Sequence, residues 1–202
     1  KDRIFAKGLC IDKLVWIFFV SALIGDWVET VFVWATSGVF MSRSSLIYGT
    51  FSIVWGLGGA LATAMLYPLK DKNPLFIFAG GFFLGGVYEY SCSVFTEVVF
   101  GTVFWDYSHL PYNINGRVNL LFCVYWGIAA IAWVKLLYPA ASFLLEKIPP
   151  VAGKIMTWII DIFMVLDMAV SGAAISRYVS RKAGVEASNP VEHMCDSIYK
   201  DK

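Results

Sequence analysis

Five long apolar runs constrain the fold of this chain more than any other feature of its sequence. Each run is close to the roughly 20 helical residues that cross the ~30 Å hydrocarbon core of a bilayer. The runs are Leu14–Thr36, Leu46–Tyr67, Leu75–Gly101, Val118–Tyr138 and Ile155–Tyr178. Runs of this length favour helices over the strands of a barrel. We therefore expect an all-α, polytopic transmembrane helix bundle of about five spans in residues 1–180, followed by a polar, poorly ordered tail over residues 181–202.

The composition excludes a water-soluble domain. Only 15% of the residues are charged and 58% are hydrophobic, whereas soluble domains carry about 25% charged residues. The surplus apolar surface must therefore face membrane lipid. A net charge of +1 gives no field that would attract nucleic acid, so we expect no nucleic-acid partner. The four cysteines and two histidines show no metal-binding spacing, and we expect neither a metal nor a cofactor.

The Lys and Arg residues of the short loops predict the orientation of the chain in the cell membrane. With a cytoplasmic N-terminus, the inner side carries Lys1, Arg3, Lys7, Lys13, Lys70, Lys72, Lys147 and Lys154. The outer short loops then carry only Arg43 and Arg117. This bias favours a cytoplasmic N-terminus, although Arg177, Arg181 and Lys182 would lie outside after five spans.

Two stretches of the chain resemble each other and predict an internal repeat. Each has a helix that contains an acid, an Arg before the next helix, a Trp-Gly pair and a closing Leu-Tyr-Pro. The first comprises Gly25-Asp26-Trp27-Val28-Glu29, Arg43, Trp55-Gly56 and Leu66-Tyr67-Pro68. The second comprises Gly86-Val87-Tyr88-Glu89-Tyr90, Arg117, Trp126-Gly127 and Leu137-Tyr138-Pro139. The pattern indicates a parallel two-helix repeat, with the fifth helix outside it.

With a rise of 1.5 Å per residue, seven charged residues within or beside these spans are expected in the outer half of the membrane or at its rim. They are Asp26, Glu29, Arg43, Glu89, Glu97, Asp106 and Arg117. On the third run, a four-residue period aligns Gly81, Gly85, Glu89, Ser93 and Glu97. Glycines on this face let another helix approach, so we expect the acids to face the protein interior. Arginines can pair with these acids through two hydrogen bonds, although snorkelling to lipid headgroups and purely structural ion pairs stay open as alternatives.

The segment from Phe104 to Arg117 is the most distinctive piece of the sequence. It reads Phe-Trp-Asp-Tyr-Ser-His-Leu-Pro-Tyr-Asn-Ile-Asn-Gly-Arg, and it concentrates aromatic and hydrogen-bonding side chains in one loop. Loops that carry function have this character, because a simple connection does not need such side chains. An ordinary interfacial belt of Trp and Tyr remains the alternative.

This loop and its neighbours carry a family resemblance. The motifs are Glu89-Tyr90, Ser93, Glu97, Trp105-Asp106-Tyr107-Ser108, Asn113, Gly116-Arg117 and Trp126-Gly127. Together they resemble the signature of the putative ABC-transporter type IV family, the CmpB-like integral membrane proteins. Arg43 with Ile47-Tyr48-Gly49 resembles an earlier element of that family, and the Asp167–Ser171 pair followed by Arg177 resembles its C-terminal helix. The resemblance covers about residues 14–178 and implies a transporter permease.

The residues and the resemblance together define a candidate substrate-binding pocket at the outer side of the membrane, with no catalytic residue assigned. Its members are Glu29, Arg43, Tyr48, Glu89, Tyr90, Ser93, Glu97, Trp105, Asp106, Asn113, Arg117 and Trp126. Buried carboxylates and aromatic side chains of this kind suit a small polar or ionic solute.

Transport or binding of such a solute by a permease-like protein is the favoured function. The chain has no Gly-rich phosphate loop and so no ATPase of its own. Five spans are few for a carrier, and we expect a homo-oligomer or a separate partner subunit. A membrane-embedded enzyme acting on a lipid or lipid-linked phosphate ranks below transport, because no nucleophile and base lie close together in sequence. A non-catalytic membrane scaffold subunit is the third interpretation.

Overall fold

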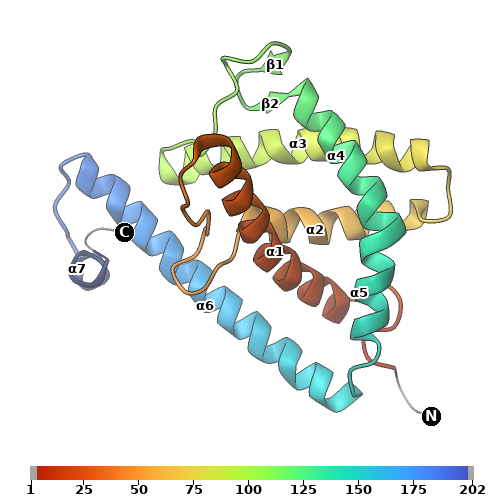
Figure 1. The fold of residues 1–202 in the computed structure, drawn as a ribbon. Helices are drawn as coiled ribbons and strands as arrows, with labels where there is room; N and C mark the ends of the chain where they lie inside the picture. The colour runs from red at the N-terminus through yellow and green to blue at the C-terminus, as the bar shows by residue number, and fades with distance from the viewer. Residues whose placement is uncertain (1–3, 200–202) are drawn as a thin grey trace.

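The computed structural model describes residues 4–199, which form a helical bundle with one small hairpin (Figure 1). Lys1 and Arg3, used in the orientation argument, and the last three residues of the predicted tail lie outside the described residues. The long helices are α1 (Ile11–Ser37), α3 (Pro74–Phe100) and α6 (Pro150–Lys182), and the shorter ones are α2 (Ile53–Leu66), α4 (Leu120–Ala132), α5 (Tyr138–Leu145) and α7 (Pro190–Ile198). A 3₁₀ turn (Tyr67–Leu69) follows α2, a π-helical turn (Trp133–Leu137) joins α4 to α5, and the strands are β1 (Asn113–Ile114) and β2 (Val118–Asn119).

Within residues 4–199, four helices are long and apolar enough to cross a membrane, by length and composition. They are Ile11–Ser37, Pro74–Phe100, Leu120–Leu145 and Pro150–Lys182. The prediction of an all-α, multi-pass membrane protein is therefore confirmed. The prediction of five full spans holds only in part, because the second apolar helix, Ile53–Leu69, is shorter than the others.

The second predicted span, residues 46–67, was placed too early, since residues 38–52 form a loop. Serine side chains in this loop satisfy the backbone without a helix, which explains the difference. Ser44 Oγ donates to the carbonyl oxygen of Leu46 at 2.9 Å and accepts from the amide of Phe51 at 3.1 Å. Gly49 has a φ of +89°, a left-handed conformation that interrupts a helix.

Helix α6 holds this loop against the bundle. The backbone amide of Ile47 donates to Ser171 Oγ at 2.9 Å, and the amide of Tyr48 donates to Asp167 Oδ1 at 3.3 Å. Asp167 and Ser171 are both buried and hydrogen bond to each other at 3.1 Å. These polar residues of the last predicted span therefore serve the tertiary structure by anchoring the loop.

The fourth predicted span, residues 118–138, begins later and ends later than expected. Asn119 caps α4 by accepting from the amide of Leu121 at 2.8 Å, so the helix starts at Leu120. The chain then remains helical past Pro139 as far as Leu145. The π-helical turn just before Pro139 accommodates the missing backbone donor, so the proline does not end the helix.

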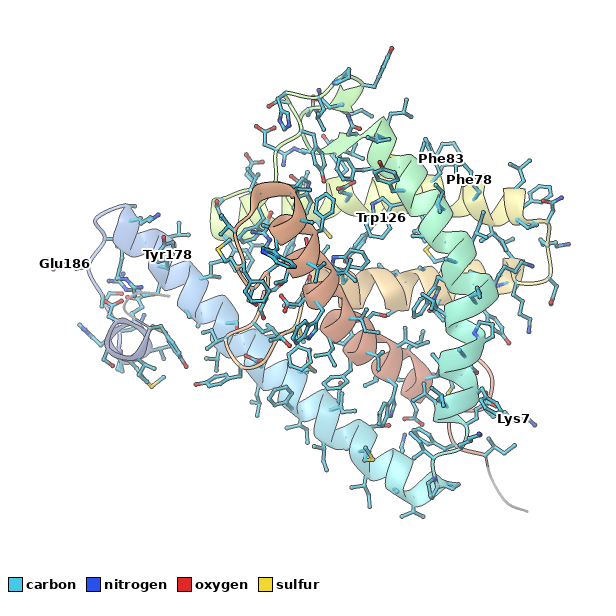
Figure 2. The ribbon with its side chains drawn as sticks, viewed as in Figure 1. Lys7, Phe78, Phe83, Trp126, Tyr178 and Glu186 are labelled. Carbon is cyan, nitrogen blue, oxygen red and sulfur yellow. The ribbon has the colours of Figure 1, made fainter. Side chains whose placement is uncertain are left out.

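Helices α1 and α2 pack as one close pair, and α3 and α4 pack as another. In each pair a glycine of the first helix lies directly against a tryptophan of the second. A Cβ atom on Gly25 would come within 2.1 Å of Trp55, and one on Gly85 would come within 2.2 Å of Trp126. Trp126 of α4 is labelled in Figure 2. The close approach of both pairs therefore depends on the absence of a side chain at these two positions.

The predicted interior face of the third run is confirmed in α3 for four of its five residues and is wrong for Glu97. Gly81, Gly85, Glu89 and Ser93 are all buried, whereas Glu97 at the helix end is exposed. The glycines lie against α4, and the acid and the serine continue the same face toward the loop after α3.

The segment expected to be a poorly ordered tail contains helix α7, which lies beside the end of α6 (Figure 1). Arg177 is buried and binds both carboxylate oxygens of Asp196, each at 2.8 Å. Arg181 donates to Asp196 at 2.5 Å and to the carbonyl oxygen of Tyr199 at 3.0 Å. We call Arg177, Arg181 and Asp196 the C-terminal clasp, because they fasten α7 to α6.

We expect the C-terminal clasp to open in acid. Hydrogen bonds from Arg177 and Arg181 lower the pKa of Asp196 to about 2, whereas an unfolded aspartate has a pKa of about 3.9. Because the folded-state pKa is the lower one, the clasp contributes its full stability above about pH 4 and loses it as the pH falls through 2. Hydrogen exchange of the α7 amides, corrected for intrinsic rates, should therefore rise between pH 5 and pH 2.

The variant Asp196→Asn serves as the control for this pH dependence. It should exchange rapidly in α7 at both pH values, because the titrating carboxylate is gone. Equal protection of α7 at pH 5 and pH 2 in the unmodified protein would contradict the role of the clasp.

Candidate functional site

The β1–β2 hairpin stands between α3 and α4, at the side of the bundle where α1 and α3 end and α2 and α4 begin (Figure 1). We call this the hairpin side. The strands are antiparallel, with Asn113 opposite Asn119 and Ile114 opposite Val118. Asn115 and Gly116 have φ values of +53° and +68°, and Asn-Gly is a strong signal for such a turn. The sequence analysis did not predict this hairpin, although the Asn-Gly pair carried the signal.

The segment Trp105–Ser108 packs against the hairpin turn. The Tyr107 amide donates to the Gly116 carbonyl oxygen at 2.7 Å, and Trp105 Nε1 donates to the Arg117 carbonyl oxygen at 3.0 Å. A Cβ atom on Gly116 would lie 2.5 Å from Asp106 Oδ1, and the φ of +68° at this position favours glycine. The Trp-Asp-Tyr-Ser and Gly-Arg motifs thus form one folded unit.

Asp106 and Asn113 act inside this unit. Asp106 accepts from the backbone amide and the hydroxyl of Ser108, each at 2.8 Å, and these bonds lower its pKa. Asn113 donates to the Leu110 carbonyl oxygen at 2.7 Å and accepts from the Gly116 amide at 2.9 Å. Both side chains therefore have partners within the loop and shape it.

Arg117 joins the hairpin to α3. Its guanidinium donates to Ser93 Oγ at 3.1 Å and forms an ion pair with Glu97. It also lies over the ring of Tyr90, 5.9 Å from the centroid. Ser93 is almost fully buried, so Arg117 provides it with a partner that water cannot provide. Four of the predicted site residues are thus brought together at the end of α3.

Glu89 lies one turn before Ser93 on α3, and its side chain is buried. Tyr107 Oη donates to Glu89 Oε1 at 2.7 Å, while Oε2 has no hydrogen-bond partner among the described residues. Tyr107 is held in place by its ring, which stacks on Phe122 of α4 with centroids 4.6 Å apart. Burial, the hydrogen bond to Glu89 and the charges of Glu89 and Glu29 all raise the pKa of Tyr107. Glu89 therefore contacts Tyr107 directly, and Glu29 lies near enough to affect this tyrosine electrostatically.

Glu29 belongs to a matching set of polar groups at the end of α1. Ser52 Oγ donates to Glu29 Oε2 at 3.4 Å, and Arg43 lies near enough to interact with this carboxylate electrostatically. Asp26, which is 2% exposed, accepts from Ser42 Oγ at 3.3 Å. The loop of residues 38–52 therefore closes the α1–α2 pair as the β-hairpin loop closes the α3–α4 pair.

One predicted site residue, Tyr48, lies apart from the others, and Tyr107, which was not predicted, belongs to the site. Tyr48 lies against the C-terminal segment, where its hydroxyl is 2.9 Å from the hydroxyl of Tyr199. Tyr107, which was not chosen as a candidate, provides the hydrogen bond to Glu89. Its place in the Trp-Asp-Tyr-Ser motif was the available signal. Among the described residues, no group of three or more His, Cys, Asp or Glu side chains could hold a metal ion.

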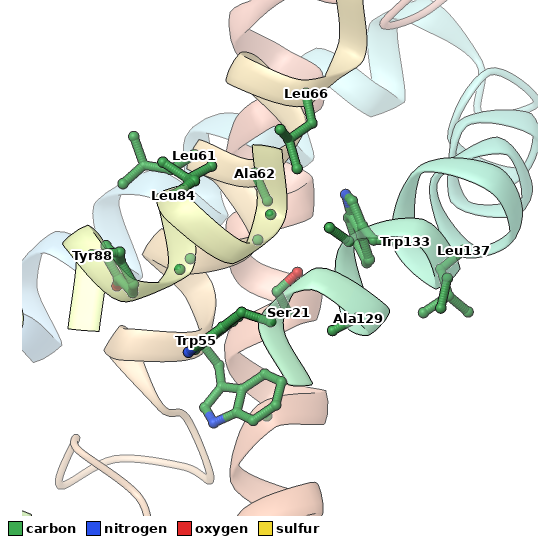
Figure 3. Close-up of a pocket in the computed structure, with 18 of the residues that line it drawn as sticks. Ser21, Trp55, Leu61, Ala62, Leu66, Leu84, Tyr88, Ala129, Trp133 and Leu137 are labelled. Atoms are coloured by element: carbon green, nitrogen blue, oxygen red, sulfur yellow. The ribbon is translucent and has the colours of Figure 1, made fainter. Parts of the chain in front are cut away.

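An apolar cavity of about 280 Å³ lies beside the carboxylates, between α1, α2, α3 and α4 (Figure 3). Trp55 and Trp126 both line it, with ring centroids 5.9 Å apart. The Trp126 indole also lies beside Glu89, and the Trp55 indole lies beside Glu29. This tryptophan pair therefore forms a wall shared by the cavity and the carboxylates.

These long apolar helices and the buried polar cluster define an integral, multi-pass membrane protein. The family model described as "Putative ABC-transporter type IV" matches residues 16–172, and the chain belongs to this family. No curated protein and no solved structure matches the chain.

Proposed function

We propose that this protein is a permease-like membrane protein that binds and moves a small polar or ionic solute, and that the solute carries a positive charge. The observation that carries the proposal is Glu89, a buried carboxylate with one oxygen bound to Tyr107 and the other without a hydrogen-bond partner in the part of the chain that the structure describes. Membership of a transporter family supports the same conclusion.

Glu89 lies in an environment that penalises a charged side chain. A charged side chain in the middle of a membrane helix costs about 2.5–3.5 kcal/mol even on mild scales. No lysine or arginine pairs with Glu89 among the described residues. Its charge is therefore stable only when a cation or a proton neutralises it. A transported cation would meet this requirement reversibly, which a permanent ion pair would not.

Arg117 supports transport over chemistry on a lipid phosphate. Its guanidinium is engaged by Glu97, Ser93 and the ring of Tyr90. A phosphate would have to displace Glu97 before it could bind both nitrogens. The cluster therefore favours cations. An enzyme acting on a lipid phosphate would lack a free Arg117 guanidinium to bind that phosphate.

We also propose that the two helix pairs arose by duplication of one two-helix unit. The contacts align Gly25 with Gly85 and Trp55 with Trp126, so that Glu29 corresponds to Glu89. This register differs by one residue from the alignment of the sequence motifs. The closing Leu-Tyr-Pro elements also meet, because the rings of Tyr67 and Tyr138 lie 5.5 Å apart. In this proposal each unit supplies one acid of the site.

The hairpin side would face away from the cytoplasm of the cell, with the N-terminus inside, as the Lys and Arg bias favours. Solute would then enter from the outer side. Because the chain has few spans for a carrier, a second copy or a separate subunit would complete the pathway.

The test is cation uptake by purified protein in liposomes, with Na⁺, K⁺ and tetramethylammonium as probes. Glu89→Gln should reduce uptake of the transported cation at least about tenfold, while its melting temperature stays close to that of the unmodified protein. Glu186→Gln, at an exposed position outside the site, is the matched control and should transport normally. Unchanged uptake by Glu89→Gln would refute the proposal and favour a scaffold role.

A further inference from the structure

The apolar cavity and the carboxylates are two parts of one continuous region. Gly25 and Gly85 line the cavity, and Glu29 and Glu89 lie one helical turn further along the same faces of α1 and α3. The shared wall consists of Trp55 and Trp126. A molecule in the cavity would therefore reach the carboxylates past the edges of two indole rings.

The cavity itself offers almost nothing to a polar molecule. The Tyr88 hydroxyl already donates to the Val54 carbonyl oxygen at 2.6 Å, and Trp133 Nε1 donates to Thr63 Oγ1 at 2.8 Å. Ser21 Oγ is the one buried lining atom without a partner among the described residues. A sugar or a hydrated inorganic ion would lose its hydrogen bonds to water there and gain few in return.

Acidic side chains outnumber basic ones at the tryptophan wall. Asp26, Glu29 and Glu89 lie on this side, and Arg43 is the cation whose field reaches Glu29. Arg117 is paired with Glu97. Tryptophan faces attract organic cations, most strongly where water is excluded. The wall therefore suits a cationic group on the carboxylate side and apolar atoms on the cavity side.

We infer that the solute is an amphipathic organic cation, with its charged group between Glu29 and Glu89 and its apolar body in the cavity. This inference rests on the proposed function and names the class of substrate. A dry cavity of roughly 150 Å³ already holds a benzene ring, so the cavity of about 280 Å³ has room for an aromatic or short aliphatic body. Ile24 and Val28 line it and are half exposed, so an amphipathic solute can enter from the bilayer.

The experiment compares three probes by calorimetric titration of the full chain in detergent. Benzyltrimethylammonium has the charge and an apolar body, tetramethylammonium has the charge alone, and neopentylbenzene is the uncharged isostere of the first. Benzyltrimethylammonium should bind at least about tenfold more tightly than either of the others. Glu89→Gln should weaken binding of both cations at least about tenfold.

Filling the cavity tests the apolar half of the site separately. Ala62→Leu adds bulk to the cavity wall and should weaken benzyltrimethylammonium at least about tenfold without affecting tetramethylammonium. If Ala62→Leu does not fold, Ala129→Leu, which also lines the cavity, serves as the test variant instead. Ala169→Leu, on the exposed face of α6 and outside the cavity, should change neither affinity.

The outcomes separate this inference from the proposed function. Equal affinity for the two cations, or full binding of benzyltrimethylammonium by the filled variants, would overturn the amphipathic substrate and leave a Glu89-dependent cation site standing. Binding of both cations that Glu89→Gln does not change would overturn the inference and the proposed function together.

Discussion

Replacement of Gly81 by leucine is expected to prevent stable folding of this protein. A Cβ atom at this position would lie 2.2 Å from Ala130 Cβ and 2.9 Å from the Trp126 backbone oxygen. A backbone atom cannot move aside as a side chain can, so α3 and α4 would have to separate. Overpacking of a well-packed core costs about 1–3 kcal/mol and occasionally more, and we expect at least ~3 kcal/mol here because backbone is in the way. Thermal unfolding in detergent measures the loss.

Gly172 provides the matched control for Gly81. Apart from the local backbone of its own helix, no described atom lies within 4 Å of a Cβ placed on Gly172, which also lies inside a long apolar helix. Gly172→Ala should leave the melting temperature unchanged or raise it, because alanine is favoured over glycine within a helix by up to about 1 kcal/mol. Gly81→Ala should lower it, and Ala130→Gly in the same chain should restore part of the loss. Equal effects of Gly81→Ala and Gly172→Ala would show that the close helix contact has no special role.

Replacement of Tyr107 by phenylalanine is expected to destabilise the protein by about 1–3 kcal/mol, the usual result of leaving a buried polar group without its partner. The ring keeps its stacking on Phe122, and the loss is confined to the hydroxyl that donates to Glu89. Loss of this bond also frees the Glu89 side chain, so affinity for a bound cation should fall in parallel. Thermal unfolding and cation titration measure the two effects.

A double-mutant cycle shows whether the effect of Tyr107 passes through Glu89. In a Glu89→Leu chain, the further change Tyr107→Phe should have little effect on stability, because no carboxylate is left to be satisfied. Tyr112→Phe is the control within the same loop, since Tyr112 is 80% exposed. Additive losses in the double variant would mean that the Tyr107 hydroxyl acts elsewhere.

The membrane helices and the polar face of α3 could be predicted because their signals are local. Gly81, Gly85, Glu89 and Ser93 recur every fourth residue, and the helical period alone places them on one buried face. Arg117 was expected to pair with a carboxylate, and it pairs with Glu97.

Other parts of the site depended on partners far along the chain. The apolar residues Leu46 and Ile47 read as the start of a span, but Asp167 and Ser171, more than a hundred residues later, bind this loop and keep it out of the helix. Tyr48 was grouped with the site because of its motif. In the structure its hydroxyl instead lies beside the hydroxyl of Tyr199, directly after α7. Periodicity carries no information about contacts of this kind.

The sequence by itself determined that this chain has long apolar membrane helices and which face of α3 turns inward, because hydropathy and helical period act over a few turns. Only the tertiary structure decided that Tyr107 reaches Glu89 and that Trp55 and Trp126 form a wall between carboxylates and an apolar cavity. Those contacts join residues of different helices and loops, and the close packing of helix pairs across glycines sets their positions.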